Sequence, residues 1–282
     1  MSQIIACIDT SNSAHGVCAA SGWCAQTLNA PVLALHVLER AENDALGDLT
    51  GAIGLGAREE LLKELAELDH RRSKIAIEQG KVMLQAACSE ITRAGAQQVS
   101  STQRHARLPE ALTDLAADTR VVVLGRQGKT HEAAADAVGS QLETVVRLSQ
   151  HPVLIIPNTF TPPSRAVIAY DASATAQRML TRLSQSPLLR GLPIQIIMAA
   201  SNTPDHQAQL VAAQTELAQA GYDSTTQLVE DEPLVTLKEV SSQPDTLLCM
   251  GAFGHSRLRE FLIGSTTNET LRQAKSSVLL IR

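Results

Sequence analysis

Short apolar runs recur along the chain, and each is bounded by residues typical of turns. Five runs lie in the first half, at residues 4–8, 32–37, 97–101 (a weaker one), 121–124 and 153–156. Five lie in the second half, at residues 166–170, 194–198, 224–229 (again weaker), 246–250 and 278–281. Short apolar runs between turn signals are typical of buried strands. We therefore expect ten strands, five in each half.

The stretches between these runs show the spacing of amphipathic helices. In residues 204–220, for example, apolar residues recur at threes and fours, and Thr203 and Pro204 supply a cap and a first helical position. Strands that alternate with helices at this spacing indicate βαβ units and a mostly parallel sheet. Uniformly apolar strands suit a sheet that helices cover on both faces, so the predicted fold class is α/β.

The two halves also resemble each other in sequence. Each opens with an apolar strand that ends in Asp-x-Ser, starting at Asp9 and at Asp171, and each closes on Gly-Ser followed by a helix and an apolar strand. We infer an internal duplication with a first domain at residues 1–157 and a second at 165–282. The linker predicted between them, residues 158–164, is rich in residues that continue neither a strand nor a helix.

The first half is longer because of an extra segment at about residues 40–80. The segment opens with a glycine-rich loop and continues as a long helix from near Arg58 to Arg93. Apolar residues follow an approximate heptad spacing along this helix: Leu61, Leu65, Leu68, Ile75, Val82 and Ala86. One interpretation is a helix that covers the sheet with a single face. The alternative is a helical contact with a partner subunit, because the apolar stripe is longer than one sheet is wide.

Composition excludes several classes of protein. Of the 282 residues, 44% are apolar but only 2% aromatic, which argues against single-stranded nucleic-acid binding because that needs stacking platforms. A formal charge of −5 gives no general reason to expect nucleic acid or an anionic membrane as a partner. No apolar stretch is long enough to span a membrane, and the N-terminus lacks signal-peptide features. The five cysteines are scattered, which favours a cytoplasmic protein without a disulfide framework or structural metal.

Candidate chemistry gathers where the first and fourth strands of each half end. In an open parallel sheet of order 3-2-1-4-5, those carboxyl ends flank the crevice in which ligands bind. Asp9 and Gly125 lie there in the first half, and Asp171 and Gly251 in the second. A carboxylate there accepts a hydrogen bond from a ribose hydroxyl or an adenine amino group. Glycines let the backbone approach phosphates, and a following helix N-terminus suits anions. The pattern outlines a mononucleotide site.

Other nucleotide and catalytic motifs are missing from the sequence. Gly128 precedes Lys129 and Thr130 as in a P-loop, but the glycine required five positions earlier is Val123. No GxGxxG follows the first strand, which argues against a dinucleotide site. No metal-ligand spacing, nucleophile–base pair or Gly-x-Ser-x-Gly elbow is found. We therefore name no catalytic residue and expect a protein that is not an enzyme, with at most slow hydrolysis of a bound nucleotide.

Two further side chains have open interpretations. His36 ends a strand, where we expect a packed, hydrogen-bonded core histidine. Arg126 follows the first-half Gly125 and either neutralises phosphate charge, together with Lys129, or is an ordinary surface cation.

The duplicated glycine pattern resembles that of the universal stress proteins in their tandem, two-domain form. Nucleotide-binding members of that family carry Gly-x2-Gly-x9-Gly-Ser/Thr after the fourth strand. The second half matches this pattern in full with Gly251, Gly254, Gly264 and Ser265. In the first half, ten residues instead of nine separate Gly128 from Gly139. The resemblance covers both halves except the segment at about 40–80.

The resemblance implies two Rossmann-like domains of the adenine nucleotide alpha hydrolase-like kind, each with a five-stranded parallel sheet of order 3-2-1-4-5, paired through their fifth strands. It implies a regulator of the stress response that binds ATP or a related adenine nucleotide, with or without Mg. The implied second-half contacts are Asp171, Ala169, Ala199, Met250, Gly251, Gly254, Gly264, Ser265 and Thr266. The corresponding, weaker candidates in the first half are Asp9, Gly125, Gly128, Gly139 and Ser140.

Two alternatives remain open. The first is a stress-related adaptor whose nucleotide sites are vestigial and whose long helix docks protein partners. The second is an enzyme that activates its substrate as an adenylate, although the Ser-Gly-Gly-rich loop of such enzymes is absent after the first strand of each half. A homodimer is a further expectation.

Overall fold

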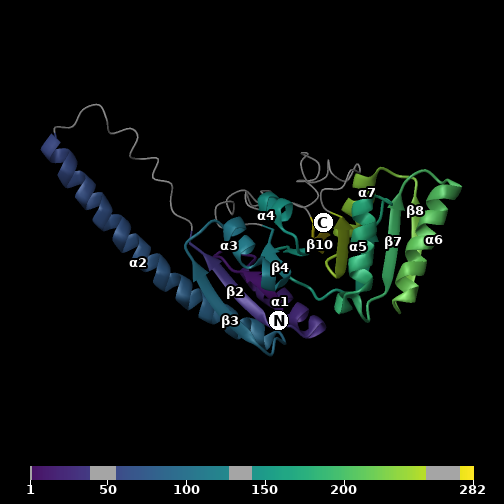
Figure 1. The fold of residues 1–282 in the computed structure, drawn as a ribbon, viewed down its shortest axis with the longest axis horizontal. Coiled ribbons are helices and arrows are strands. Elements are labelled where there is room, and N and C mark those ends of the chain that lie inside the picture. Colours follow the sequence, from purple (N-terminus) through teal and green to yellow (C-terminus); the bar gives the residue numbers. More distant parts are fainter. Residues whose placement is uncertain (1, 39–54, 127–141, 252–273) are drawn as a thin grey trace.

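The computed structural model describes residues 2–38, 55–126, 142–251 and 274–282, which form one ten-stranded sheet with helices on both faces (Figure 1). The first half contains β1 (Gln3–Cys7), α1 (Ala14–Leu28), β2 (Val32–Val37), α2 (Leu55–Arg93), β3 (Val99–Arg104), α3 (Leu108–Asp114), β4 (Thr119–Gly125), α4 (Leu142–Leu148) and β5 (Val153–Ile156). The second contains β6 (Arg165–Ala169), α5 (Ala174–Ser184), β7 (Ile194–Ala199), α6 (Pro204–Gln219), β8 (Ser224–Val229), α7 (Pro233–Ser241), β9 (Thr246–Gly251) and β10 (Ser277–Ile281).

The strand order is β3-β2-β1-β4-β5-β10-β9-β6-β7-β8. Within each half all pairs are parallel and the order is 3-2-1-4-5, as predicted. The two halves meet where β5 pairs antiparallel with β10, with Leu154 opposite Leu279. The expected pairing of the two fifth strands is therefore confirmed, and it makes the two five-stranded sheets continuous.

Each face of this sheet carries an apolar core that crosses the boundary between the halves. On one face, a cluster joins residues of α1, α2, α5 and α6, among them Val17, Ile91, Met179 and Leu217, which are at most 1% exposed. On the other face, α4 and α7 cover a second cluster that also draws on both halves. Because burial of apolar area is the main favourable term in folding, the shared cores tie the two halves together.

Arginine side chains add polar contacts between the halves. Arg126, directly after β4, is only 9% exposed and donates from Nη1 to the carbonyl oxygen of Ala274 at 2.6 Å. Arg182 of α5 donates to the Gln150 carbonyl at 3.1 Å. Ala274 is buried and its carbonyl needs a donor, so the Arg126 contact satisfies a buried backbone group at the junction, whereas the Arg182 contact is exposed.

Helix α6 begins as its sequence predicts. Pro204 is its first residue, and the side-chain oxygen of Thr203 accepts a hydrogen bond from the His206 N–H at 3.2 Å. This contact satisfies one of the donors that a helix start leaves unpaired.

Helix α2 is as long as the sequence predicts, but the face that packs is different. Its C-terminal part packs on α1, β2 and β3 and buries Leu84, Ala87 and Ile91. The predicted stripe does not cover the sheet: Leu68, Ile75 and Val82 are 45%, 58% and 68% exposed. The N-terminal part of α2 extends well beyond the sheet (Figure 1). The interpretation of the stripe as the sheet-covering face was wrong.

Within the described parts of the chain, no helix is long and apolar enough to cross a bilayer.

Glycine is required where α1 passes the end of α2. A Cβ at Gly22 would lie 2.3 Å from the Cβ of Ala94 and 2.8 Å from its carbonyl carbon. In most helices Gly→Ala stabilises by about 1 kcal/mol. We expect Gly22→Ala to lower the free energy of unfolding instead, by about 1–3 kcal/mol, because the overlap forces the two helices apart. Urea unfolding measures the change. Gln85→Ala, on the exposed side of α2, is the control and should stay within about 0.5 kcal/mol of wild type. A Gly22→Ala protein more stable than wild type would contradict the close packing.

Candidate functional site

The second-half crevice lies where the neighbouring parallel strands β6 and β9 end. Ala169, the last residue of β6, lies opposite Met250 in the register, and Gly251 ends β9. Asp171 follows β6 by two residues, and α5 starts three residues later. The strand order thus brings the predicted carboxylate and the first glycine of the predicted motif to one edge of the sheet.

The Asp171 carboxylate is held by one oxygen and open at the other. Its Oδ1 accepts a hydrogen bond from the Ser173 N–H at 3.0 Å. Its Oδ2 is buried and has no hydrogen-bond partner among the described residues. A buried acceptor without a donor costs about 1–3 kcal/mol, so a ligand donor placed there would gain a contact that the protein alone leaves unmade.

The turn into α5 fixes this carboxylate. The Ser173 hydroxyl oxygen caps α5 by accepting from the Ala176 N–H at 3.1 Å, and Ala172 has a positive φ of 56°. The Ser173 hydroxyl lies at the helix start and makes no hydrogen bond to Asp171 Oδ2. The serine of Asp-x-Ser therefore has a structural role in the second half.

Gly251 touches the first turn of α5. A Cβ there would lie 3.0 Å from Cγ2 of Thr175, a buried residue whose Oγ1 accepts from Arg178 Nη2 at 3.1 Å. Sequence reasoning missed Thr175. The only sequence signal for Thr175 is its position two residues after the helix cap, Ser173. The absence of a side chain at Gly251 keeps the strand end and the helix start in contact.

The predicted apolar contacts line the same edge. Ala169 and Met250 are buried in the core cluster beneath α7, and Ala199, which ends β7, is half-buried. On the opposite face of the sheet, the Tyr170 hydroxyl donates to Gln177 Oε1 at 2.8 Å. Burial raises the pKa of Tyr170, and the Glu216 and Asp171 carboxylates add to this.

The first half arranges its carboxylate differently. Oδ1 of Asp9 accepts both the backbone N–H and the hydroxyl of Ser11, at 3.0 and 2.5 Å. The Ser11 hydroxyl also lies 2.9 Å from that of Ser13, which is the N-cap position of α1. The loop between strand and helix is two residues longer here, so the Asp-x-Ser serine turns toward the carboxylate instead of capping the helix. Asp9 therefore already has donors within the chain.

Arg126 is not an ordinary surface cation. It is 9% exposed, and its Nη1 donates across the junction to Ala274. The interpretation in which Arg126 neutralises phosphate charge stays a prediction. The position of Gly125, at the end of β4 beside β5, is as predicted.

Two other first-half groups are half-buried near the ends of their strands. His36 donates from Nδ1 to the Ile8 carbonyl at 2.8 Å, which confirms the expected hydrogen-bonded histidine. Burial, with a contribution from Asp9, raises the pKa of the Cys7 thiol to about 12, so Cys7 stays protonated near neutral pH. The remaining predicted contacts lie outside the described residues: Gly128, Gly139, Ser140, Gly254, Gly264, Ser265 and Thr266.

Comparison with known proteins decides the family. A family model, "Universal stress protein family", matches the chain twice, over residues 1–157 and 164–282. The chain belongs to the universal stress protein family. Its similarity extends to a whole relative: it is 34% identical to universal stress protein Slr1230 of Synechocystis sp. over 289 aligned residues that cover all of both chains.

Solved structures share the tandem fold of this family member. A universal stress protein from Archaeoglobus fulgidus DSM 4304 is similar over 99% of this chain and 96% of its own, with a TM-score of 0.68 and 18% identity. A functionally unknown protein from Pseudomonas aeruginosa PAO1 is similar over 99% and 92%, with a TM-score of 0.58 and 14% identity. At these identities the likeness concerns the fold.

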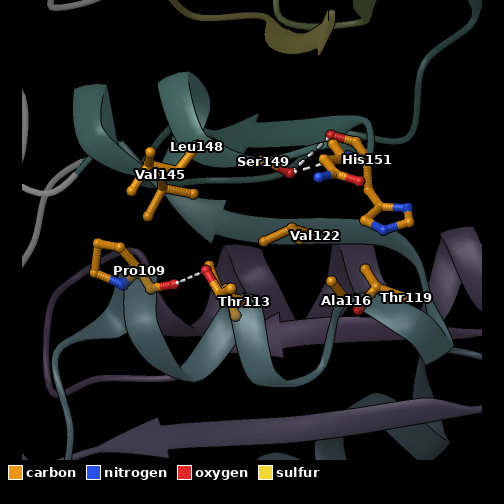
Figure 2. Close-up of a pocket in the computed structure, with 11 residues that line it drawn as sticks. Pro109, Thr113, Ala116, Thr119, Val122, Val145, Leu148, Ser149 and His151 are labelled. Carbon is orange, nitrogen blue, oxygen red and sulfur yellow. Dashed lines mark hydrogen bonds between the residues drawn. The ribbon is translucent and has the colours of Figure 1, made fainter.

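This universal stress protein has a separate small pocket of about 50 Å³ between α3, α4 and β4 (Figure 2). The pocket contains Thr113, Val122 and Leu148, and His151 lies at one end of it. The Ser149 hydroxyl bonds to the backbone of His151 rather than to its ring, at 2.9 Å from the carbonyl oxygen. The pair is therefore a local turn and not a nucleophile with its base.

The surroundings of His151 predict a pH effect on stability. Burial lowers its pKa and Arg182 adds to this, while a hydrogen bond with the Ala116 backbone opposes it. Because the folded-state pKa lies below the unfolded value of 6.5, the unfolded chain binds more protons at mildly acidic pH. The contribution of His151 is thus present at pH values above 6.5 and is lost as the pH falls below it. We expect His151→Gln to lose less stability than wild type between neutral pH and pH 5, as measured by urea unfolding across that range. Parallel pH profiles for the two proteins would contradict this assignment.

Proposed function

We propose that the crevice of the second half binds an adenine nucleotide, ATP or a close relative, and that the chain acts as a nucleotide-dependent regulator in the stress response. The observation that carries this proposal is the buried Oδ2 of Asp171, which lacks a hydrogen-bond donor among the described residues. It lies at the strand-order switch point, where ligands bind in sheets of this topology.

The groups around Asp171 suit a nucleoside. Its carboxylate oxygen can accept from a ribose hydroxyl or from the adenine amino group, the two donors that a nucleoside presents. Ala169 and Met250 give the neighbouring surface an apolar character. In the sequence, Gly251 begins the full Gly-x2-Gly-x9-Gly-Ser pattern, whose backbone N–H groups suit phosphates. The ligand is proposed with or without Mg²⁺.

Regulation is favoured over catalysis. The described residues of the crevice include no nucleophile paired with a general base, so we propose at most slow ATP hydrolysis. Binding would couple Gly251 on β9 to the start of α5, since these already touch. A protein partner that binds this edge of the sheet would therefore distinguish the nucleotide-bound from the nucleotide-free protein.

The second candidate function is an adaptor whose nucleotide sites are vestigial. The contacts of Asp9 support a vestigial site in the first half only. Asp9 Oδ1 accepts two hydrogen bonds from Ser11, against one at Asp171 Oδ1, and the buried oxygen without a donor among the described residues belongs to Asp171. We therefore propose one nucleotide per chain. The cytoplasm is the proposed location because all five cysteines are free thiols.

Paired asparagine variants test this assignment. Asp171→Asn keeps an oxygen for the Ser173 N–H but replaces the second oxygen with an NH₂ donor. We expect it to weaken ATP binding at least roughly tenfold by isothermal titration calorimetry, because a contact to a charged acceptor is worth about 1.5–3 kcal/mol. Asp9→Asn is the matched control, and its affinity should stay within about twofold of wild type.

Three results would contradict the proposal. These are a wild-type protein that binds no ATP, an Asp171→Asn affinity equal to wild type, and an Asp9→Asn loss as large as that of Asp171→Asn. Circular dichroism and urea unfolding of both variants show whether any loss of binding reflects loss of fold.

A further inference from the structure

Helix α2 has two apolar faces on opposite sides. The inner face packs on the sheet through Leu84, Ala87 and Ile91, which are at most 5% exposed. The outer face carries Leu68, Ile75 and Val82, which are exposed. Since each helical residue turns about 100°, Val82 and Leu84 point about 200° apart. We refer to Leu68, Ile75 and Val82 as the outer stripe.

The outer stripe has the spacing of a coiled-coil seam. Its members are seven residues apart, and Leu65 precedes Leu68 at the three-residue step that separates the two seam positions. Seam residues pack against a second helix and not against a sheet. The outer face stays open beside the packed part of α2 as well, where Gln85, Ala86 and Ser89 are exposed. A partner helix can therefore lie along α2 without meeting the sheet of this chain.

We propose that the outer stripe binds α2 of a second copy of this chain in an antiparallel coiled coil centred near Ile75. Each layer of an antiparallel seam contains one residue of each seam position. Val82 of each copy then packs on Leu65 of the other, and Ile75 lies beside Arg72 next to the two-fold axis. The proposal is independent of nucleotide binding, and its failure would leave that function untouched.

The charges beside the outer stripe favour this partner. Arg71 and Glu78 occupy the same flanking position in successive heptads, on the side of the seam next to Leu68 and Ile75. In an antiparallel pair, this flank faces itself, so Arg71 of one copy faces Glu78 of the other, and symmetry makes the contact twice. Glu78 lies 2.8 Å from Lys81 in its own helix, but both side chains are more than 60% exposed, so that pair is weak.

A parallel pair is disfavoured by the same residues. It would place Glu64 beside Asp69 of the second copy, which is a like-charge contact. It would also put the two Arg72 guanidinium groups in one layer of the seam. In the antiparallel pair, Arg72 of each copy lies beside Ile75 of the other, so the two guanidinium groups are in different layers. It also separates the two globular bodies, because each is attached at the C-terminal end of α2 (Figure 1).

Sedimentation equilibrium of the full chain over a range of concentrations tests the association. We expect wild type to dimerise and Val82→Asp to weaken the dimer at least roughly 100-fold, because the carboxylate would be buried against Leu65 of the other copy twice per dimer. His70→Asp, an exposed position on the far side of the same helix, is the control and should leave the dimer unchanged. Circular dichroism confirms that each variant is folded.

Charge exchange tests the antiparallel register. Arg71→Glu or Glu78→Arg alone should weaken the dimer roughly tenfold, because each turns two attractive contacts into repulsive ones. Mixing the two single variants should restore association, since each contact then joins a carboxylate of one variant to a guanidinium of the other. A monomeric wild type, or a dimer that survives Val82→Asp, would overturn the proposal. A mixture no tighter than either variant alone would overturn the antiparallel pairing.

Discussion

The antiparallel pairing of β5 with β10 is the contact on which the arrangement of the whole chain depends. It joins two parallel sheets into one, so apolar clusters on both faces continue from one half into the other. Arg126 follows β4 and can reach the Ala274 carbonyl because this pairing brings the two segments together. The duplicated fold is thus one continuous structure with one predicted nucleotide site in each half.

Loop length after the first strand separates the two crevices chemically. The shorter second-half loop makes Ser173 the cap of α5 and leaves one buried oxygen of Asp171 without a described partner. In the longer first-half loop, Ser13 takes the N-cap position and the Ser11 hydroxyl donates to Asp9. Two copies of Asp-x-Ser therefore perform different tasks, and this difference underlies the proposal of one nucleotide per chain.

The sequence predicted the strands well because their apolar runs are buried on both faces, and even the polar edge strand β8 was found at its observed bounds. It placed Asp171 and Gly251 together because strand order alone determines that edge. It could not predict the contacts of Ser11 or Arg126, which depend on loop length and on the partner half. It chose the wrong face of α2, because periodicity does not show which of two apolar faces meets the sheet.

Hydrogen exchange with and without ATP tests the central claim, a nucleotide site in the second half, most directly. Exchange reports local opening, and a bound ligand reduces it where it stabilises the backbone. We expect ATP to protect amides in residues 170–176 and 246–251 but not those in residues 8–14. Absence of protection, or protection of the first half alone, would contradict it.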